Sequence, residues 1–239
     1  MKRLAYILLL LLLLLVTSAA AEDSIRIRGC NTGKNRGHAL TRSISRTTNN
    51  ARIGNKRQMV VLASFADKQF KSPNPLQLWD RIFNETGFAE DKFNGSIHDY
   101  FYDQSYGKFQ LQFDLHHVSL ANNRVKYAST LEDDENSQYL VYDIVDTLNN
   151  RGSIDWSPYD WDDDGYIDQI IIIFAGMGQN SGGGPNTIWP HHGFLTWHTD
   201  GHTKTVTSKG KSFIINRYCC IQEENSRGEY GSFGTICHE

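Results

Sequence analysis

Asp160-Trp-Asp-Asp-Asp-Gly-Tyr-Ile-Asp-Gln-Ile-Ile-Ile-Ile-Phe-Ala-Gly176 is the stretch around which this chain is organised. It opens with an acidic turn, in which Gly165 lets the backbone reverse direction. An unbroken apolar run, Ile170 to Phe174, follows directly. The run is too short for an independent helix and is rich in β-branched residues. It therefore predicts a strand that is buried on both faces.

The acidic turn carries four carboxylates at spacings that suit a hard cation such as Ca²⁺. They are Asp160, Asp162, Asp164 and Asp168. The turn differs from an EF-hand loop, because Ile171 stands where that loop has its bidentate Glu. We expect a calcium loop of another kind, with these four side chains and the Tyr166 carbonyl as ligands. The alternative is a solvated acidic turn without an ion.

The first 21 residues have the pattern of a secretory signal peptide. Lys2 and Arg3 precede the apolar run Leu8 to Leu15, and Ala19-Ala20-Ala21 supplies small residues for cleavage. The apolar run is shorter than the roughly 20 residues of a spanning helix, so an uncleaved anchor is the weaker alternative. We expect cleavage after Ala21, with Ala20 as the second choice. The mature chain is then exported and makes no stable membrane insertion.

Length and charge limit the remaining possibilities. A chain of 239 residues favours one domain, and its formal net charge is −3. Loss of Lys2 and Arg3 with the leader makes the mature chain more acidic, which argues against nucleic acid as a partner. Residues 22–57 are polar and lack a sustained period, so they predict a linker or pro-segment. The folded domain is expected over residues 58–239.

Four cysteines are too few for a disulfide framework in an exported chain of this size. They are Cys30, Cys219, Cys220 and Cys237. The neighbours Cys219 and Cys220 do not easily bridge each other without strain. Buried thiols and one long-range bridge both remain possible, and we assign no pairing.

Hydrophobic periodicity predicts strands and helices that alternate along the domain. Strands are expected at 59–65, 109–115, 170–174 and 213–221, and helices at 75–83, 97–106 and 131–150. Ser96 has the chemistry of a helix cap, and the acidic cluster 132–135 suits the positive end of a helix dipole. These elements predict an α+β domain, in which helices pack on a sheet.

The sequence contains two histidine pairs that are candidate metal ligands. His116 and His117 continue the strand at 109–115, and we interpret them as strand surface. His198 and His202 have the spacing of two ligands on one helix face. Gly201 follows Asp200 in a pattern that breaks such a helix, so we do not assign zinc to this pair.

The sequence given ends with Gly234-Thr-Ile-Cys-His-Glu239. Ser232 can cap a helix that has barely begun at residue 239, and an isolated helix needs roughly 12 to 15 residues. The chain therefore has the pattern of one that is cut inside a helix. If the continuation is x-x-His, the motif becomes His-Glu-x-x-His, in which two imidazoles bind Zn²⁺ and the Glu is the general base.

Four motifs in this order resemble the immune inhibitor A family of secreted zinc metalloproteases. They are Asn94-Gly-Ser-Ile-His-Asp-Tyr-Phe-Tyr-Asp-Gln-Ser-Tyr-Gly107, the Asp160–Gly176 stretch, Ile188-Trp-Pro-His191 and Gly234-Thr-Ile-Cys-His-Glu239. The resemblance implies a zincin-like α+β catalytic domain, incomplete at its C-terminus, that acts on protein or peptide substrates. It also implies that His238 is a zinc ligand and Glu239 the general base.

Two functions of different classes follow from these patterns. The first is a secreted zinc endopeptidase, inactive as a 239-residue fragment because the remaining zinc ligands lie beyond Glu239. The second is a non-catalytic exported module, stabilised by calcium, that presents Trp189 and Trp197 to a glycan or a protein. A continuation of x-x-His after Glu239 distinguishes the first from the second.

Overall fold

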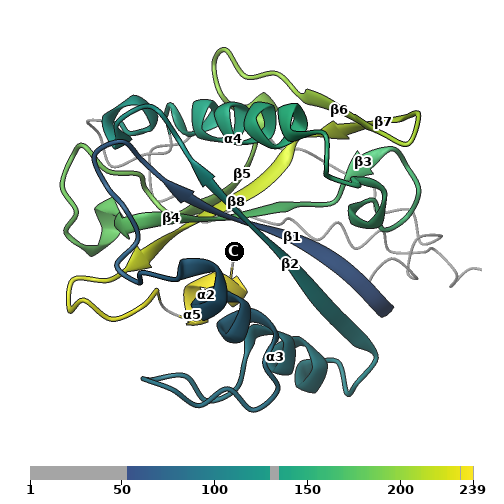
Figure 1. Ribbon diagram of the computed structural model, residues 1–239, viewed down its shortest axis with the longest axis horizontal. Coiled ribbons are helices and arrows are strands. Elements are labelled where there is room, and N and C mark those ends of the chain that lie inside the picture. The colour runs from purple at the N-terminus through teal and green to yellow at the C-terminus, as the bar shows by residue number, and fades with distance from the viewer. Residues whose placement is uncertain (1–52, 130–134, 232, 239) are drawn as a thin grey trace, which may run out of the picture. The chain divides into compact units, whose positions relative to one another are not determined.

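A computed structural model of the protein describes residues 53–129, 135–231 and 233–238. The apolar run at 170–174 lies in strand β4 (Ile170–Met177), the middle strand of a five-stranded sheet (Figure 1). Ile170 to Ala175 are at most 9 % exposed, because other elements cover both faces of this strand. The expected strand, buried on both faces, is confirmed.

The main sheet has the strand order β2-β1-β4-β8-β5. Its strands are β1 (Gly54–Ser64), β2 (Phe109–Ser119), β4, β8 (Arg217–Glu224) and β5 (His191–Phe194). β1 pairs in parallel with β2 and β4, and β4 pairs in parallel with β8. β5 lies at one edge and pairs antiparallel with β8. β1 begins a little before residue 58, where the sequence placed the start of the domain.

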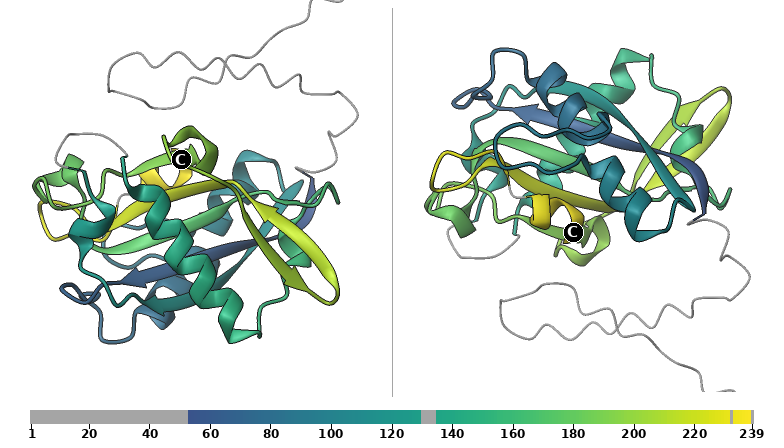
Figure 2. Two further views of the ribbon diagram at one scale, coloured as in Figure 1. Left: turned by 90° about the horizontal axis from the view of Figure 1, so that it is seen from above. Right: turned by 90° about the horizontal axis from the view of Figure 1, so that it is seen from below.

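Helices cover the main sheet on both faces. One face carries α2 (Pro75–Asn84), α3 (Ile97–Gln104) and α5 (Phe233–His238), and the other carries α4 (Ser137–Arg151) (Figures 1 and 2). Parallel strands require such crossover connections, and these leave few strand residues in contact with water. The described residues thus form the mixed sheet with packed helices that the α+β prediction requires.

A small second sheet corrects one prediction. It has the order β3-β7-β6, with β3 (Tyr166–Ile167), β7 (Lys211–Ile215) and β6 (Lys204–Ser208). The sequence predicted one strand over 213–221, but β7 belongs to this sheet and β8 to the main sheet. The chain leaves one sheet for the other at Asn216, whose carbonyl accepts the Leu195 N–H at 2.7 Å. A single polar residue between two apolar runs gave no sign of this change.

The start of α4 also differs from the prediction. The sequence placed it at Leu131, which lies outside the described residues, but the helix begins at Ser137. Asn136 has a left-handed conformation with φ of 73°, so an α-helix cannot run through it. The apolar residues at helical spacing in this stretch predict its inner face, and of these Leu140, Ile144, Val145 and Leu148 are buried. Tyr139 is only partly buried.

α3 begins where the sequence predicts. The Ser96 hydroxyl accepts the Asp99 N–H at 3.1 Å, and the Asp99 carboxylate accepts the Ser96 N–H at 2.9 Å. This reciprocal pair is a capping box, which satisfies two backbone donors that a helix start leaves open. The Asp99 carboxylate also accepts the Gly87 N–H at 2.8 Å and so ties the preceding loop to the helix.

His116 and His117 lie in β2 as expected, but they are half-buried rather than on the strand surface. The His117 Nε2 lies 3.1 Å from the Ser64 hydroxyl. Burial lowers the pKa of both imidazoles. Alternating apolar and polar residues at 109–115 predict one buried face and one wet or edge-like face. They do not show that Arg151 of α4 reaches this edge, where it donates to the His117 carbonyl at 2.9 Å.

Short 3₁₀ segments connect several elements. They are η2 (Arg124–Tyr127), η3 (Ser157–Tyr159), η4 (Gln179–Ser181) and η5 (Leu195–Trp197). Within residues 53–129, 135–231 and 233–238, no helix combines the length and the apolar character needed to cross a bilayer. The predicted leader (1–21), the predicted linker (22–57) up to residue 52, and Cys30 lie outside the described residues.

Candidate active site and metal centre

α5 carries the first candidate zinc ligand. The helix follows β8 after a short turn, and His238 is its last described residue and is exposed to solvent. An exposed imidazole at this position is accessible to a metal ion. Ser232, the expected cap, and Glu239, the expected general base, lie outside the described residues. Their predicted roles therefore stay predictions.

Aromatic packing sets the position of α5 on the sheet. The Phe233 ring lies 5.6 Å from the Tyr100 ring of α3, at 84° between the ring planes, and 6.4 Å from the Phe93 ring. Ile236, one turn further along, is 5 % exposed. These contacts hold the described part of the helix, Phe233–His238, against its neighbours.

The turn between β8 and α5 is held at several points. Glu224 forms a β-bridge with Tyr230, and the Glu223 carbonyl accepts the Gly231 N–H at 2.5 Å. Lys92 forms an ion pair with Glu229 in this turn. These contacts hold the segment between β8 and residue 231, which leads into α5.

Cys237 lies next to His238 but does not have the character of a metal ligand. It is half-buried in α5, and burial raises the pKa of its thiol to about 12. In the absence of a metal, this thiol is therefore protonated at neutral pH. The neighbouring imidazole of His238 is the candidate metal ligand of this helix.

The acidic turn forms the second candidate metal centre. Asp160, Asp162 and Asp168 each place a carboxylate oxygen within 4.8 Å of the others. Asp164 is not part of this group, and its Oδ1 accepts the Tyr166 N–H at 2.8 Å. The structure thus brings together three of the four predicted ligands. Three carboxylates around one point match the oxygen ligands that Ca²⁺ prefers.

Electrostatics in the acidic turn also favour a cation. Burial raises the pKa of Asp168, and the nearby Asp162 and Asp164 raise it further. Burial likewise raises the pKa of Asp160, although its two oxygens accept the Asp164 and Gly165 N–H groups at 3.1 and 3.0 Å. A bound cation removes the repulsion among these carboxylates and favours their charged forms.

Sequence reasoning missed a buried polar network under α4. The Tyr218 hydroxyl lies 2.8 Å from each of three groups, Ser137 Oγ, His191 Nε2 and His198 Nε2. The network joins the start of α4 to β8, β5 and the residues after η5. In the sequence, Tyr218 is one residue of an apolar strand. Nothing in the sequence indicates that its hydroxyl contacts three polar side chains.

His198 and His202 do not lie on a helix, as the Asp200-Gly201 pattern between them predicts. His198 follows η5 with extended backbone, and its Nε2 meets Tyr218. The His202 ring instead stacks on Tyr142 of α4, with 4.5 Å between ring centroids. The two rings therefore belong to different contacts.

A cluster of aromatic side chains lies on the edge strand β5 and the following segment η5. The Phe194 ring lies 4.6 Å from the Trp197 ring, and the His192 ring lies 5.6 Å from Phe194. Arg217 of β8 stacks over Phe194 at 5.1 Å. His192 is half-buried, and burial, with a contribution from Arg217, lowers its pKa to about 4.

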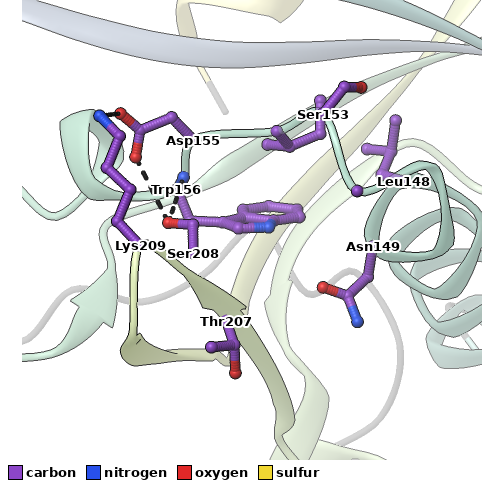
Figure 3. Close-up of a pocket in the computed structure, with 10 residues that line it drawn as sticks. Leu148, Asn149, Ser153, Asp155, Trp156, Thr207, Ser208 and Lys209 are labelled. Atoms are coloured by element: carbon purple, nitrogen blue, oxygen red, sulfur yellow. Dashed lines mark hydrogen bonds and ion pairs between the residues drawn. The ribbon is translucent and has the colours of Figure 1, made fainter.

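A cavity of about 310 Å³ lies between the end of α4 and the turn that joins β6 to β7 (Figure 3). Asp155 points toward Lys209 there, with 2.6 Å between carboxylate and ammonium, and its pKa is well below its usual range because of this pair. Trp156 forms part of the wall. α4 and α5 cover opposite faces of the sheet, so this cavity is separate from His238 (Figure 1).

Comparison with known proteins agrees with the motifs. No curated protein matches this chain. The model of the immune inhibitor A peptidase M6 catalytic domain matches residues 55–239, which include both candidate metal centres. The chain therefore belongs to the immune inhibitor A (M6) family of metallopeptidases.

Proposed function

We propose that this protein is an exported zinc endopeptidase, in which His238 binds the metal and Glu239 is the general base. The observation that carries the proposal is the position of His238 at the end of α5, a helix that packs on the sheet of a metallopeptidase domain, with Glu239 next in the sequence. Family membership favours this function over the binding module with Trp189 and Trp197. The substrates proposed are proteins or peptides.

His238 and Glu239 have different roles in the proposed hydrolysis of the peptide bond. Zinc held there would supply a Lewis acid that polarises the scissile carbonyl and lowers the pKa of water. His238 contributes one of the three protein ligands that catalytic zinc sites have. Glu239 accepts the proton of the attacking water and returns it to the leaving amine.

Metal analysis and peptide hydrolysis test this proposal in protein expressed from its complete reading frame. Glu239→Gln should keep zinc, because the side chain is not a ligand, but lose at least about 99 % of turnover. His238→Ala should lose both zinc and turnover. His202→Ala, on the other face of the sheet, is the matched imidazole control and should keep both. Full activity of the Glu239→Gln variant would refute the assigned mechanism.

We also propose that the acidic turn binds structural Ca²⁺. Support comes from Asp160, Asp162 and Asp168, whose oxygens lie within 4.8 Å of one another. The turn leads directly into β3 and β4, so a cation there would stiffen the entry to the central strand. Asp164 and the Tyr166 carbonyl remain predicted ligands of the same ion.

Export is the third part of the proposal. It is supported by Lys2, Arg3, the run Leu8 to Leu15 and the alanines before residue 22. Mass spectrometry of the extracellular protein tests it, and the expected N-terminus is Glu22, from cleavage after Ala21. Extracellular protein that retains Met1 would contradict it.

A further inference from the structure

Glu223 is a carboxylate in the interior that the proposed chemistry does not use. It lies on β8, the strand that leads into α5, and it is 0 % exposed. A buried carboxylate is costly unless hydrogen bonds replace its water. One oxygen accepts the Lys71 N–H at 2.7 Å, and the other accepts the Gly176 N–H at 3.0 Å. Both carboxylate oxygens are therefore used to hold backbone.

The two donors come from segments that are far apart in the sequence. Lys71 lies in the loop between β1 and α2, and Gly176 lies near the end of β4. Gly176 has φ of 86°, and a Cβ there would lie 2.7 Å from the Lys68 Cε. The left-handed φ favours glycine at this position, where the N–H reaches the carboxylate.

Lys71 extends this connection into the turn before α5. Its ammonium donates to the Gly228 carbonyl at 2.6 Å and lies 5.5 Å from the Tyr230 ring centroid. The Glu223 carbonyl meanwhile accepts the Gly231 N–H. Glu223 thus holds the turn twice, directly through its main chain and indirectly through Lys71.

We infer that Glu223 is a positioning residue for the active-site helix, because its carboxylate ties the β1–α2 loop and the end of β4 to the strand and turn that lead into α5. This inference rests on the proposed function of His238, the last described residue of that helix, and of Glu239, which follows it in the sequence. Glu223 itself touches neither the metal nor the substrate in this assignment.

Glu224 provides the matched control. It is the next residue on β8, and it pairs with the Lys68 ammonium at 3.4 Å, with its side chain 15 % exposed. Glu224→Gln removes a charge at almost the same place without changing the bonds to Lys71 and Gly176. In Glu223→Gln, an amide N–H₂ replaces one of the two acceptor oxygens and faces a backbone donor, so one of the two bonds is lost.

The test compares wild type, Glu223→Gln and Glu224→Gln from the complete reading frame. Hydrogen exchange of residues 225–238 is measured without metal, well below the melting temperature. In Glu223→Gln this segment should exchange about tenfold faster, while amides of β1 and β4 keep wild-type protection. Zinc affinity and kcat should fall about tenfold, with KM within about twofold. Glu224→Gln should match wild type in all three.

The outcomes separate this inference from the proposed function. If Glu223→Gln only lowers the melting temperature, and exchange in residues 225–238 and kcat match wild type, the inference is wrong. If wild type neither retains zinc nor cleaves peptides, the proposed function fails. The metal-free exchange comparison then still decides whether Glu223 holds α5, since unchanged exchange contradicts the inference and faster exchange supports the positioning role.

Discussion

The Phe233 ring of α5 lies edge-on against the Tyr100 ring of α3, with 5.6 Å between the ring centroids. Aromatic pairs of this geometry contribute about 0.5–1.5 kcal/mol beyond the area that they bury. The contact is made at the start of α5, and His238 is the last described residue of this helix. The Tyr100 ring therefore helps to hold the helix that carries the proposed zinc ligand.

Tyr100→Leu should weaken zinc retention several-fold while it lowers the free energy of unfolding by only about 1 kcal/mol. The reason is that the Leu side chain leaves α5 without its edge-on partner, whereas the core below stays intact. Tyr102→Leu, on the same helix but stacked on His98, is the control and should keep zinc. Metal analysis and urea denaturation measure the two effects. Equal zinc loss in both variants would contradict the prediction.

Calcium should raise the melting temperature, and substitutions in the acidic turn should distinguish its ligands. A chelator removes the ion from the folded form and so removes the stabilisation that binding provides. Asp168→Asn should abolish the response to re-added Ca²⁺, because its carboxylate is in the converging group. Asp163→Asn is the control, since Asp163 is outside that group and Asn tolerates its φ of 57°.

Asp164→Asn then separates the sequence prediction from the geometry. The sequence predicts Asp164 as a ligand, whereas in the structure its carboxylate accepts the Tyr166 N–H. A loss of the calcium response as large as that of Asp168→Asn would show that Asp164 joins the ion. Calorimetric scans with Ca²⁺, with Zn²⁺ and with chelator measure the response. A wild-type melting curve that is the same with and without chelator would remove the calcium site.

The pKa of His192 predicts acid sensitivity. It is lowered from about 6.5 to about 4, so the unfolded chain binds a proton at a higher pH than the folded chain. The contribution of His192 to the free energy of unfolding should therefore be fully present above about pH 6.5. It should be lost as the pH decreases toward 4. The contribution is at most about 3 kcal/mol, and partial exposure of the ring reduces it.

His192→Asn removes this titration and should flatten the dependence of stability on pH between 6.5 and 4. Some slope should remain, because burial lowers the pKa of His116 and His117 as well. Chemical denaturation at several pH values measures the slope. An unchanged slope in the variant would show that His192 titrates normally in the folded protein.

The capping box of α3 makes a prediction about stability. Ser96→Ala should lower the free energy of unfolding by about 1 kcal/mol, because the Asp99 N–H then loses its acceptor in a buried position. Ser153→Ala, at an exposed position just after α4, is the control. Urea denaturation of both variants measures the difference. A loss of stability no larger than that of Ser153→Ala would show that the cap contributes little.

The elements that could be predicted from sequence are those whose signals are local. The run Ile170 to Phe174 predicted the central strand because β-branched residues without a polar face fit only a strand with both faces covered. Ser96 predicted the start of α3 because a cap and its partner lie three residues apart. In the acidic turn, the spacing of Asp160, Asp162 and Asp168 carried the same kind of local information.

The features that the sequence did not show depend on contacts between distant residues. Asn216 separates β7 from β8 because its carbonyl meets Leu195, and no pattern within 213–221 contains that partner. The Tyr218 hydroxyl joins α4 and β5, and the Glu223 carboxylate joins the loop after β1 to the end of β4. The hydrogen-bonding partners of such polar residues on buried strands come together only in the folded chain, so the sequence alone does not show them.

The place of β8 between β4 and β5 has a consequence for synthesis of the chain. As the chain leaves the ribosome, β1 can pair with β2 and then with β4, as soon as each of them has emerged. The far side of β4 stays open until residues 217–224 emerge, and β5 emerges before β8, the strand with which it pairs. An apolar strand with an open edge is the feature through which incomplete chains associate. The nascent protein is therefore most prone to aggregation in the interval between the synthesis of Phe174 and that of Glu224.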